Sequence, residues 1–281
     1  MSLCTVRLVS ENSGGGQSVG TGYFYTFTET RGDEFLKIPV LVTNKHVVNG
    51  AVKITGEIRI FPRENVIHSH GSADGEIMFP LTFTPTEGLD LIVMHPDPEV
   101  DLCAIPMASL FIPGLLPDGY IHKLSFIDER WLLTPEEEEF LRPIESIIMV
   151  GYPDGLWDEV NNRPIARRGL TASHALRRWN DKRQFVIDAA CFPGSSGSPV
   201  FLYEDGLFRV ATGYTPGVRA KLLGTLFAGP MVTREGIIEI RDIPTAGTPV
   251  PVTSMMMNLG FCVHASALAE IHEVIKEREK T

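Results

Sequence analysis

Three short segments of this chain carry residue types that together could transfer an acyl group to an alcohol. "LVTNKHVV" contains His46, "HPDPEVDLCAIP" contains Asp101, and "PGSSGSPVF" contains three serines within four positions. A serine hydroxyl is a weak nucleophile at neutral pH, so it needs a neighbouring base that takes its proton as it attacks. An imidazole can take that proton and pass it to the leaving group, and a carboxylate can hold the imidazole in the required tautomer.

Each of these segments also has an ordinary structural explanation. A short Gly/Ser run is most often a turn, a histidine after an apolar strand is usually structural, and an aspartate before "LCAI" usually opens a strand. The combination is more informative, because histidine, aspartate and serine follow one another at separations of 55 and 95 residues when the serine is Ser196. This order is typical of a nucleophilic triad.

The order of these three residues and the sequence around each of them resemble those of the trypsin-like, or chymotrypsin-like, serine endopeptidases. The resemblance is closest to their HtrA-type and glutamyl-endopeptidase-type bacterial branches. "VTNKHVV" resembles the histidine motif of that family, and "DAACFPGSSGSPVF" resembles its nucleophile motif. "MVGYPDGL" and "RRGLTAS" are similar to the strands that lead to the nucleophile, while "LLGTLFAG" and "NLGFCVH" are similar to the walls of the specificity pocket. The resemblance extends from Thr21 to Val263.

The resemblance assigns a role to each candidate residue. In the family the nucleophile lies two residues after the first glycine of its motif, Gly194, and directly before the second, which selects Ser196. His46 is then the general base and acid, Asp101 orients it, and the N–H groups of Gly194 and Ser196 form the oxyanion hole. Ser195 stands where the family has Asp or Asn, and this shorter side chain offers fewer bonds to hold the oxyanion loop.

Several alternatives stay open at this point. Asp90, in "GLDLIVMHP", is a competing acid, although its segment resembles the strand just before the triad aspartate. The nucleophile segment nearly matches the G-x-S-x-G of α/β-hydrolases, but its last position is Ser198 and the strand–helix alternation of that fold is missing. A catalytically silent, protease-like binding or scaffolding module is the rival class, and an esterase on the same scaffold is a third possibility.

The resemblance also predicts where a substrate side chain binds. The expected pocket residues are Ala190, Cys191, Phe227, Ala228, Gly229, Gly260 and Cys262. Trypsin carries an acid at the position of Ala190, and glutamate-specific relatives carry a histidine at that of Leu226. We therefore expect neither a basic nor an acidic preference, but small to medium apolar side chains at the P1 position. Cys191 and Cys262 are expected close together, as reduced thiols.

The elements that position these residues are predicted to be short strands. Alternating or β-branched runs are separated by turn-forming residues, and the βαβ alternation of a parallel sheet is absent. With the resemblance, this predicts an all-β fold of two antiparallel six-stranded barrels. The expected limits are 1–115 for the barrel with His46 and Asp101, 116–145 for a connecting segment, 146–263 for the barrel with Ser196, and 264–281 for a C-terminal helix.

Two helices have clear sequence signals. "LTPEEEEFLRP" has Thr134 as an N-cap, Pro135 at the first helical position and glutamates in the first turn, where negative charge favours the helix dipole. "ASALAEIHEVIKEREK" has Leu268, Ile271 and Ile275 at helical spacing, which predicts an amphipathic helix. The sequence ends soon afterwards, so we expect no peptide-binding PDZ domain like that of HtrA proteins.

Composition narrows the functional classes. The 281 residues carry a net charge of −10, so a general nucleic-acid binder is not expected, because phosphate contacts need a basic surface. The chain shows neither a secretory signal pattern nor the roughly 18 consecutive apolar residues of a membrane span. We therefore expect no membrane partner and a cytoplasmic location, although a mature secreted form would show the same pattern.

No cofactor or metal is expected for this chemistry. The four cysteines are too far apart in the sequence for a zinc site of the CxxC kind. "HSHGSAD" offers His68, His70 and Asp74, but we interpret it as a polar hairpin tip. The expected partner is a polypeptide substrate, and the sequence does not indicate an oligomeric state.

Overall fold

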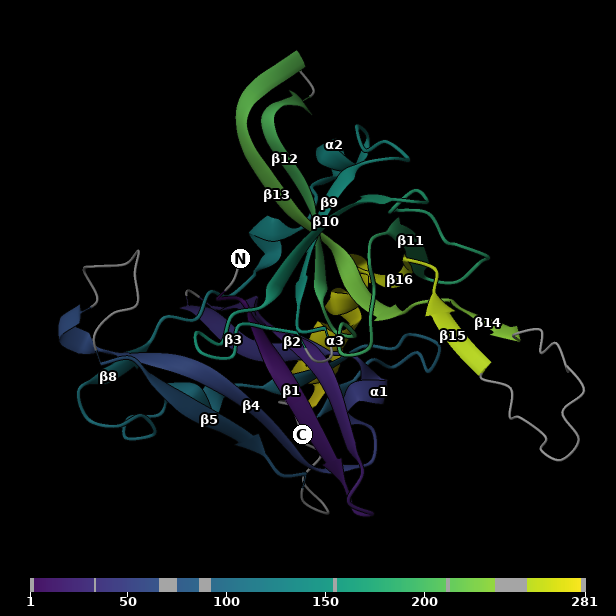
Figure 1. Ribbon diagram of the computed structural model, residues 1–281. Coiled ribbons are helices and arrows are strands. Elements are labelled where there is room, and N and C mark those ends of the chain that lie inside the picture. The colour runs from purple at the N-terminus through teal and green to yellow at the C-terminus, as the bar shows by residue number, and fades with distance from the viewer. Residues whose placement is uncertain are drawn as a thin grey trace, which may run out of the picture.

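The computed structural model describes residues 3–32, 34–65, 75–85, 92–153, 156–210, 213–235 and 252–278. The chain forms two β-rich halves that meet along one side, and helix α3 lies at their junction (Figure 1). The fold is mostly β, as predicted. Within the described ranges, no helix is long and apolar enough to cross a membrane.

The first half is an antiparallel sheet of eight strands. Its order is β5-β4-β1-β2-β3-β7-β6, and β8 pairs with β4 off this path. The strands are β1 Thr5–Asn12, β2 Gln17–Arg31, β3 Glu34–Thr43, β4 Ala51–Pro62, β5 Ile77–Phe83, β6 Val93–Met94, β7 Cys103–Pro106 and β8 Tyr120–His122. Short helical turns join them at α1 Lys45–Val48, Arg63–Asn65, Ala108–Phe111 and Glu129–Trp131.

The prediction of a six-stranded barrel for this half was wrong in its strand count and closure. Over the residues that the structure describes, the eight strands do not close into a ring. One of the eight strands, β8, is only three residues long, and it pairs with a distant part of the chain: Phe61 of β4 pairs with Ile121 of β8. Hydrophobic alternation within a segment does not reveal such pairing.

The second half is a closed barrel of six strands in the order β10-β11-β16-β13-β12-β9. These are β9 Ser146–Gly151, β10 Ile165–Thr171, β11 Gln184–Asp188, β12 Pro199–Val210, β13 Gly213–Ala228 and β16 Leu259–His264. Strands β12 and β13 stay paired out to Val210 and Gly213, and this hairpin projects from the barrel (Figure 1). Strands β14 Met231–Glu235 and β15 Val252–Met256 form a separate two-stranded sheet.

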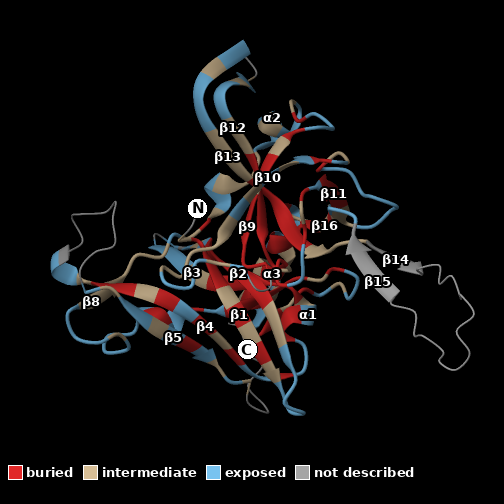
Figure 2. Cartoon of the chain, viewed as in Figure 1, coloured by how far each residue is buried: buried red, intermediate tan, exposed pale blue. Residues whose placement is uncertain are grey.

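Three apolar clusters hold the molecule together. One fills the first half around Leu8, Phe24 and Ile54, and one fills the second half around Ile147 and Phe185. The third joins the two halves, since it includes residues from both and from helix α3: Tyr23, Val42, Val150, Phe201 and Ile271. Figure 2 shows the buried residues concentrated where the halves meet, with exposed residues at the hairpin tips.

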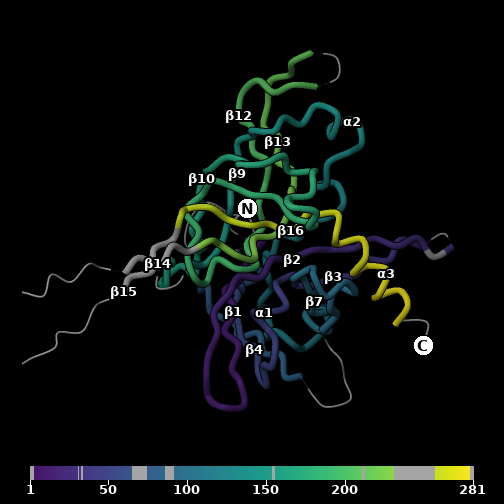
Figure 3. Tube along the Cα trace, turned by 90° about the vertical axis from the view of Figure 1, so that its right-hand side faces the viewer, coloured from purple at the N-terminus to yellow at the C-terminus, as the bar shows by residue number. Residues whose placement is uncertain are grey.

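The predicted C-terminal helix is confirmed as α3 Leu268–Arg278, which follows a short helical turn at Ala265–Ala267. It buries Leu268, Ile271 and Ile275, the apolar positions that the sequence indicated. The turned view in Figure 3 shows the chain passing from β16 of the second half to α3 beside the first half. Glu270 of α3 pairs with Arg183 of the second half and lies 3.4 Å from His95 Nε2 of the first.

The glutamate-rich segment forms the predicted short capped helix, the single turn α2 Pro135–Glu138. Its start follows the prediction, because the Thr134 hydroxyl accepts the Glu137 N–H and the Glu137 carboxylate accepts the Thr134 N–H. Such a capping box satisfies two N–H groups at the helix start.

Candidate active site

Strand β3 and the segment before β7 bring His46 and Asp101 together. His46 lies in α1, the single helical turn after β3, and Asp101 lies two residues before β7, which pairs with β3. The Asp101 carboxylate accepts two hydrogen bonds from the same residue, from His46 Nδ1 at 2.5 Å and from the His46 N–H at 3.1 Å. Asn44 donates to the Asp101 carbonyl at 2.7 Å. The imidazole is therefore fixed through Nδ1, and its Nε2 makes no hydrogen bond to any described residue.

The nucleophile segment runs from β11 to β12 as a tight loop. The Ser195 N–H donates to the Phe192 carbonyl at 3.0 Å, and Gly194 has φ +82°. A turn with proline at its second position and a positive φ at its third is of type II, and glycine is the residue that adopts it at little cost. Pro193 and Gly194 supply these two positions.

Among the described residues 194–198 of this loop, two N–H groups make no hydrogen bond. The N–H groups of Ser195, Gly197 and Ser198 donate to Phe192, Leu226 and Ser195. No hydrogen bond joins the N–H of Gly194 or of Ser196 to another group in the described part of the chain. These are the two donors that the oxyanion hole was predicted to use.

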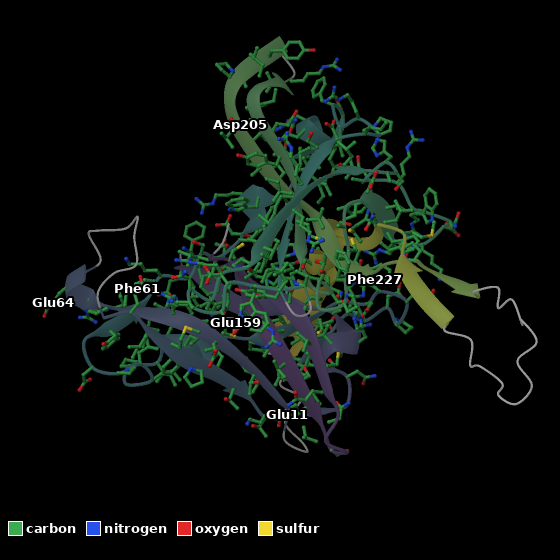
Figure 4. All side chains as sticks on the ribbon, in the orientation of Figure 1. Glu11, Phe61, Glu64, Glu159, Asp205 and Phe227 are labelled. Atoms are coloured by element: carbon green, nitrogen blue, oxygen red, sulfur yellow. The ribbon has the colours of Figure 1, made fainter. Side chains whose placement is uncertain are left out.

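Burial distinguishes the three serines. Ser195 and Ser198 are buried, at 1% and 0% exposure, and their hydroxyls have no partner among the described residues. Ser196 is only half-buried, and its hydroxyl lies 3.4 Å from the Phe227 carbonyl of β13. Figure 4 labels Phe227 beside the junction of the two halves. Ser196 is thus the accessible alcohol of the loop, as the motif predicted.

Strand β2 places the histidine turn against the nucleophile loop. A Cβ built on Gly20 would lie 2.6 Å from Val47, the residue after His46, and 3.3 Å from the Ser196 carbonyl. The turn and the loop therefore approach the same glycine from the two halves. In the described residues no hydrogen bond connects Ser196 to His46, and such bonds are often long in free enzymes and shorten with substrate.

The sequence reasoning gave no role to Thr21, the next residue of β2. It is fully buried, its N–H donates to the Ser196 carbonyl at 2.7 Å, and its hydroxyl donates to the Gly194 carbonyl at 3.1 Å. A hydroxyl residue between two glycines just inside a strand ("GTG") was the only signal for it in the sequence.

The predicted pocket residues lie on three adjoining segments. Ala190 and Cys191 precede the nucleophile loop, Phe227 and Ala228 end β13 and Gly229 follows it, and Gly260 and Cys262 belong to β16. Strand pairing sets Cys262 against Leu226. A Cβ on Gly260 would lie 2.6 Å from both Cys191 Sγ and Leu226 Cδ1, so these two side chains already fill the space beside Gly260.

All four cysteines are buried free thiols. Burial raises the pKa of Cys191 to about 11, and it raises that of Cys262 well above its ordinary value. A thiolate is the reactive form of cysteine, so these side chains act as small apolar groups in the wall.

A groove lies between the two halves. It has a volume of about 240 Å³, and its lining includes Phe227, whose carbonyl lies 3.4 Å from the Ser196 hydroxyl. Acidic and basic side chains share its walls, and these are Asp97, Glu99, Asp181, Arg178, Lys182 and Arg183.

Some candidates cannot be placed. Asp90, His68, His70 and Asp74 lie outside the described residues. Across the ranges that are described, no three His, Cys, Asp or Glu side chains form a group able to hold a metal ion.

Comparison with known proteins supports the assignment from the site. The profile of the trypsin-like peptidase domain matches residues 20–208, more than half of the chain and all three triad candidates. The chain belongs to the trypsin-like peptidase family. This confirms the predicted class, a trypsin-like serine protease.

The chain is also similar to several solved structures. The chain is similar to the HtrA-type protease AlgW with a tripeptide, at a TM-score of 0.50 and 15% identity, covering 99% of this chain and 62% of that one. It is also matched to a serine endoprotease from Yersinia pestis (TM-score 0.46, 13% identity, 98% and 64% covered). A thermostable serine protease, AL20, from an extremophilic microorganism matches at a TM-score of 0.45 and 13% identity, with 96% and 95% covered.

The chain spans less than two thirds of the length of the first two of these structures. No curated protein matches the sequence.

Proposed function

We propose that this chain is an endopeptidase that hydrolyses peptide bonds through an acyl-enzyme on Ser196. The Ser196 oxygen attacks the carbonyl carbon of the scissile bond while His46 Nε2 takes its proton. The bond to the amine then breaks, and the amine leaves with the proton that His46 returns. Water then attacks the carbonyl carbon of the acyl-enzyme while His46 takes its proton. The bond to the Ser196 oxygen breaks, this oxygen recovers the proton from His46, and the carboxylic acid is released. Asp101 keeps the imidazole in place and stabilises its protonated form.

The observation that carries this proposal is the pairing of His46 with Asp101 next to a serine loop that has two unused N–H groups. Donors aimed at a developing oxyanion are worth roughly 2.7–4 kcal/mol each in comparable sites. The type II turn at Pro193–Gly194 supports an oxyanion hole that is formed before substrate binds, because it holds Gly194 at its positive φ.

We further propose that the P1 pocket accepts small to medium apolar side chains. Cys191 and Leu226 fill the space beside Gly260 with apolar side chains, which supports a small apolar P1 site. Ala190 provides no charge to pair with a substrate. The groove lined by Phe227 carries charges of both signs, which suit a polypeptide rather than one small molecule.

A fluorophosphonate probe tests the proposal directly, since it reacts only with an activated serine. The wild-type protein is expected to be labelled, and Ser196→Ala is expected to lose the label, while Ser195→Ala and Ser198→Ala keep it if they fold. An unlabelled wild type would favour the silent binding module instead.

Substrate profiling separates peptidase from esterase. A peptide library with all residues at P1 is expected to be cleaved after Ala, Val and residues of similar size. Turnover of activated esters without any peptide cleavage would assign the esterase. Cleavage after Arg, Lys or Glu would contradict the proposed pocket.

The domain limits given by the sequence remain a proposal, as does a cytoplasmic location. The four reduced cysteines support that location, because disulfides are rare in reducing compartments.

A further inference from the structure

The nucleophile loop holds its peptide planes in an alternating pattern. The Gly194–Ser195 peptide is bonded at both ends, through its carbonyl to the Thr21 hydroxyl at 3.1 Å and through its N–H to Phe192 at 3.0 Å. The Ser196–Gly197 peptide is also bonded at both ends, to the Thr21 N–H at 2.7 Å and to the Leu226 carbonyl at 2.8 Å. The two unused N–H groups belong to the Pro193–Gly194 peptide, which precedes the first of these, and to the Ser195–Ser196 peptide, which lies between them.

Thr21 is the residue that fixes both of the bonded peptides. It belongs to β2 in the first half, whereas the loop belongs to the second, so its contacts cross the junction. Its hydroxyl accepts the Tyr152 N–H at 3.0 Å, and a hydroxyl has only one proton to give. That proton is therefore directed to the Gly194 carbonyl. The Thr21 carbonyl accepts from Thr43 Oγ1 at 2.7 Å, so both its backbone and its side chain are held.

The loop lacks the anchor that its own side chain could supply. Ser195 replaces the Asp or Asn that stands beside the nucleophile in similar proteins, and its buried hydroxyl has no partner in the described part of the chain. The loop is nonetheless held from outside, because Gly197 lets the Thr21 carbonyl approach: a Cβ there would lie 1.8 Å from that oxygen. The contacts that hold the loop in place therefore come from Thr21 and not from Ser195.

We propose that Thr21 is a positioning residue whose hydroxyl fixes the oxyanion loop in its active geometry. This inference rests on the proposed function. Thr21 does not touch the reacting atoms, but loss of its hydroxyl frees the Gly194 carbonyl and lets the adjoining peptides rotate. A rotated Gly194 N–H no longer points at the oxyanion, so transition-state binding suffers while ground-state binding does not.

The test compares Thr21→Val with Thr21→Ser. Valine keeps the branched shape and removes the hydroxyl, whereas serine keeps the hydroxyl. We expect Thr21→Val to lower kcat by about 10- to 100-fold with KM changed less than about threefold, since the loss of a whole oxyanion donor costs about 10² to 10³ in kcat. Affinity for a peptide aldehyde, which forms a tetrahedral adduct, should fall in parallel with kcat. Thr21→Ser should stay within about threefold of the wild type.

Thr171→Val is the matched control. Thr171 is as buried as Thr21, and its hydroxyl likewise donates to a carbonyl, that of Pro143, and accepts an N–H, that of Glu145, both at 2.8 Å. The Thr171→Val variant should lose about as much unfolding free energy as Thr21→Val, but its kcat should stay that of the wild type. The inference is overturned if Thr21→Val loses no more kcat than Thr171→Val, or if Thr21→Ser loses as much as Thr21→Val. If Thr21→Val fails to fold, Thr21→Ser and the aldehyde affinities of the folded variants decide. The proposed function fails separately, through a wild type that no fluorophosphonate labels.

Discussion

Replacing Gly197 by alanine tests the close approach between the two halves at the active site. Gly197 has φ +88°, which costs a residue with a side chain about 1–2 kcal/mol. Its new Cβ would also lie 1.8 Å from the Thr21 carbonyl and 2.7 Å from the Thr43 hydroxyl. The Thr21 carbonyl would have to recede by about 1 Å, and overpacking of this kind costs about 1–3 kcal/mol. We expect Gly197→Ala to lose about 2–5 kcal/mol of unfolding free energy and to lose its peptidase activity.

Gly119→Ala is the matched control for the backbone alone. Gly119 has φ +82°, but a Cβ there meets nothing within 4 Å. In urea denaturation followed by circular dichroism, Gly119→Ala should cost only about 1–2 kcal/mol. If Gly197→Ala costs no more than Gly119→Ala, the approach of Thr21 to the loop is not as the structure has it, and the reasoning fails.

Three further outcomes follow from the structure. Asp101→Asn should fold normally but reduce kcat by about 10³–10⁴-fold, because an amide at this position favours the wrong tautomer of His46; a loss under tenfold in steady-state kinetics would contradict the assigned role. Burial lowers the pKa of His95 below its ordinary 6.5, although the nearby Glu270 carboxylate acts in the opposite direction. The unfolded chain therefore binds a proton at His95 more readily than the folded one. As a result, the free energy of unfolding falls as the pH drops below about 6.5. Thermal melts of His95→Asn should show a weaker pH dependence between about pH 7 and 5, by at most about 1.4 kcal/mol per pH unit, and an unchanged slope would refute this source. Ellman's reagent should find four thiols in unfolded, unreduced protein and react slowly with the folded one, since all four, Cys191 included, are buried; fewer than four would reveal a disulfide.

The sequence predicted the class of protein better than its architecture. The nucleophile motif is so specific that Ser196 could be selected from three serines, and the structure leaves it as the accessible one. The amphipathic positions of the final helix were also visible, because helical periodicity is a local property. The capping residues Thr134 and Pro135 likewise marked where α2 begins, although not where it ends.

What the sequence could not show depends on distant pairing. The strand Tyr120–His122 joins the first sheet through β4, and no periodicity in its three residues announces a partner so far away. Thr21 was missed for the same reason, because its hydroxyl donates to the carbonyl of Gly194, which lies 173 residues later in the chain. Ser195 raised a correct question about the loop, but its answer lay in a residue of the other half.

The contact of Thr21 with the nucleophile loop also affects the stage of folding at which the proposed active site is complete. His46 and Asp101 are synthesised well before Ser196, and the loop is braced only once both halves have formed and docked. A nascent or half-unfolded molecule therefore has a serine but no arranged site around it. In the proposed mechanism, peptide hydrolysis therefore requires both halves to be folded and docked.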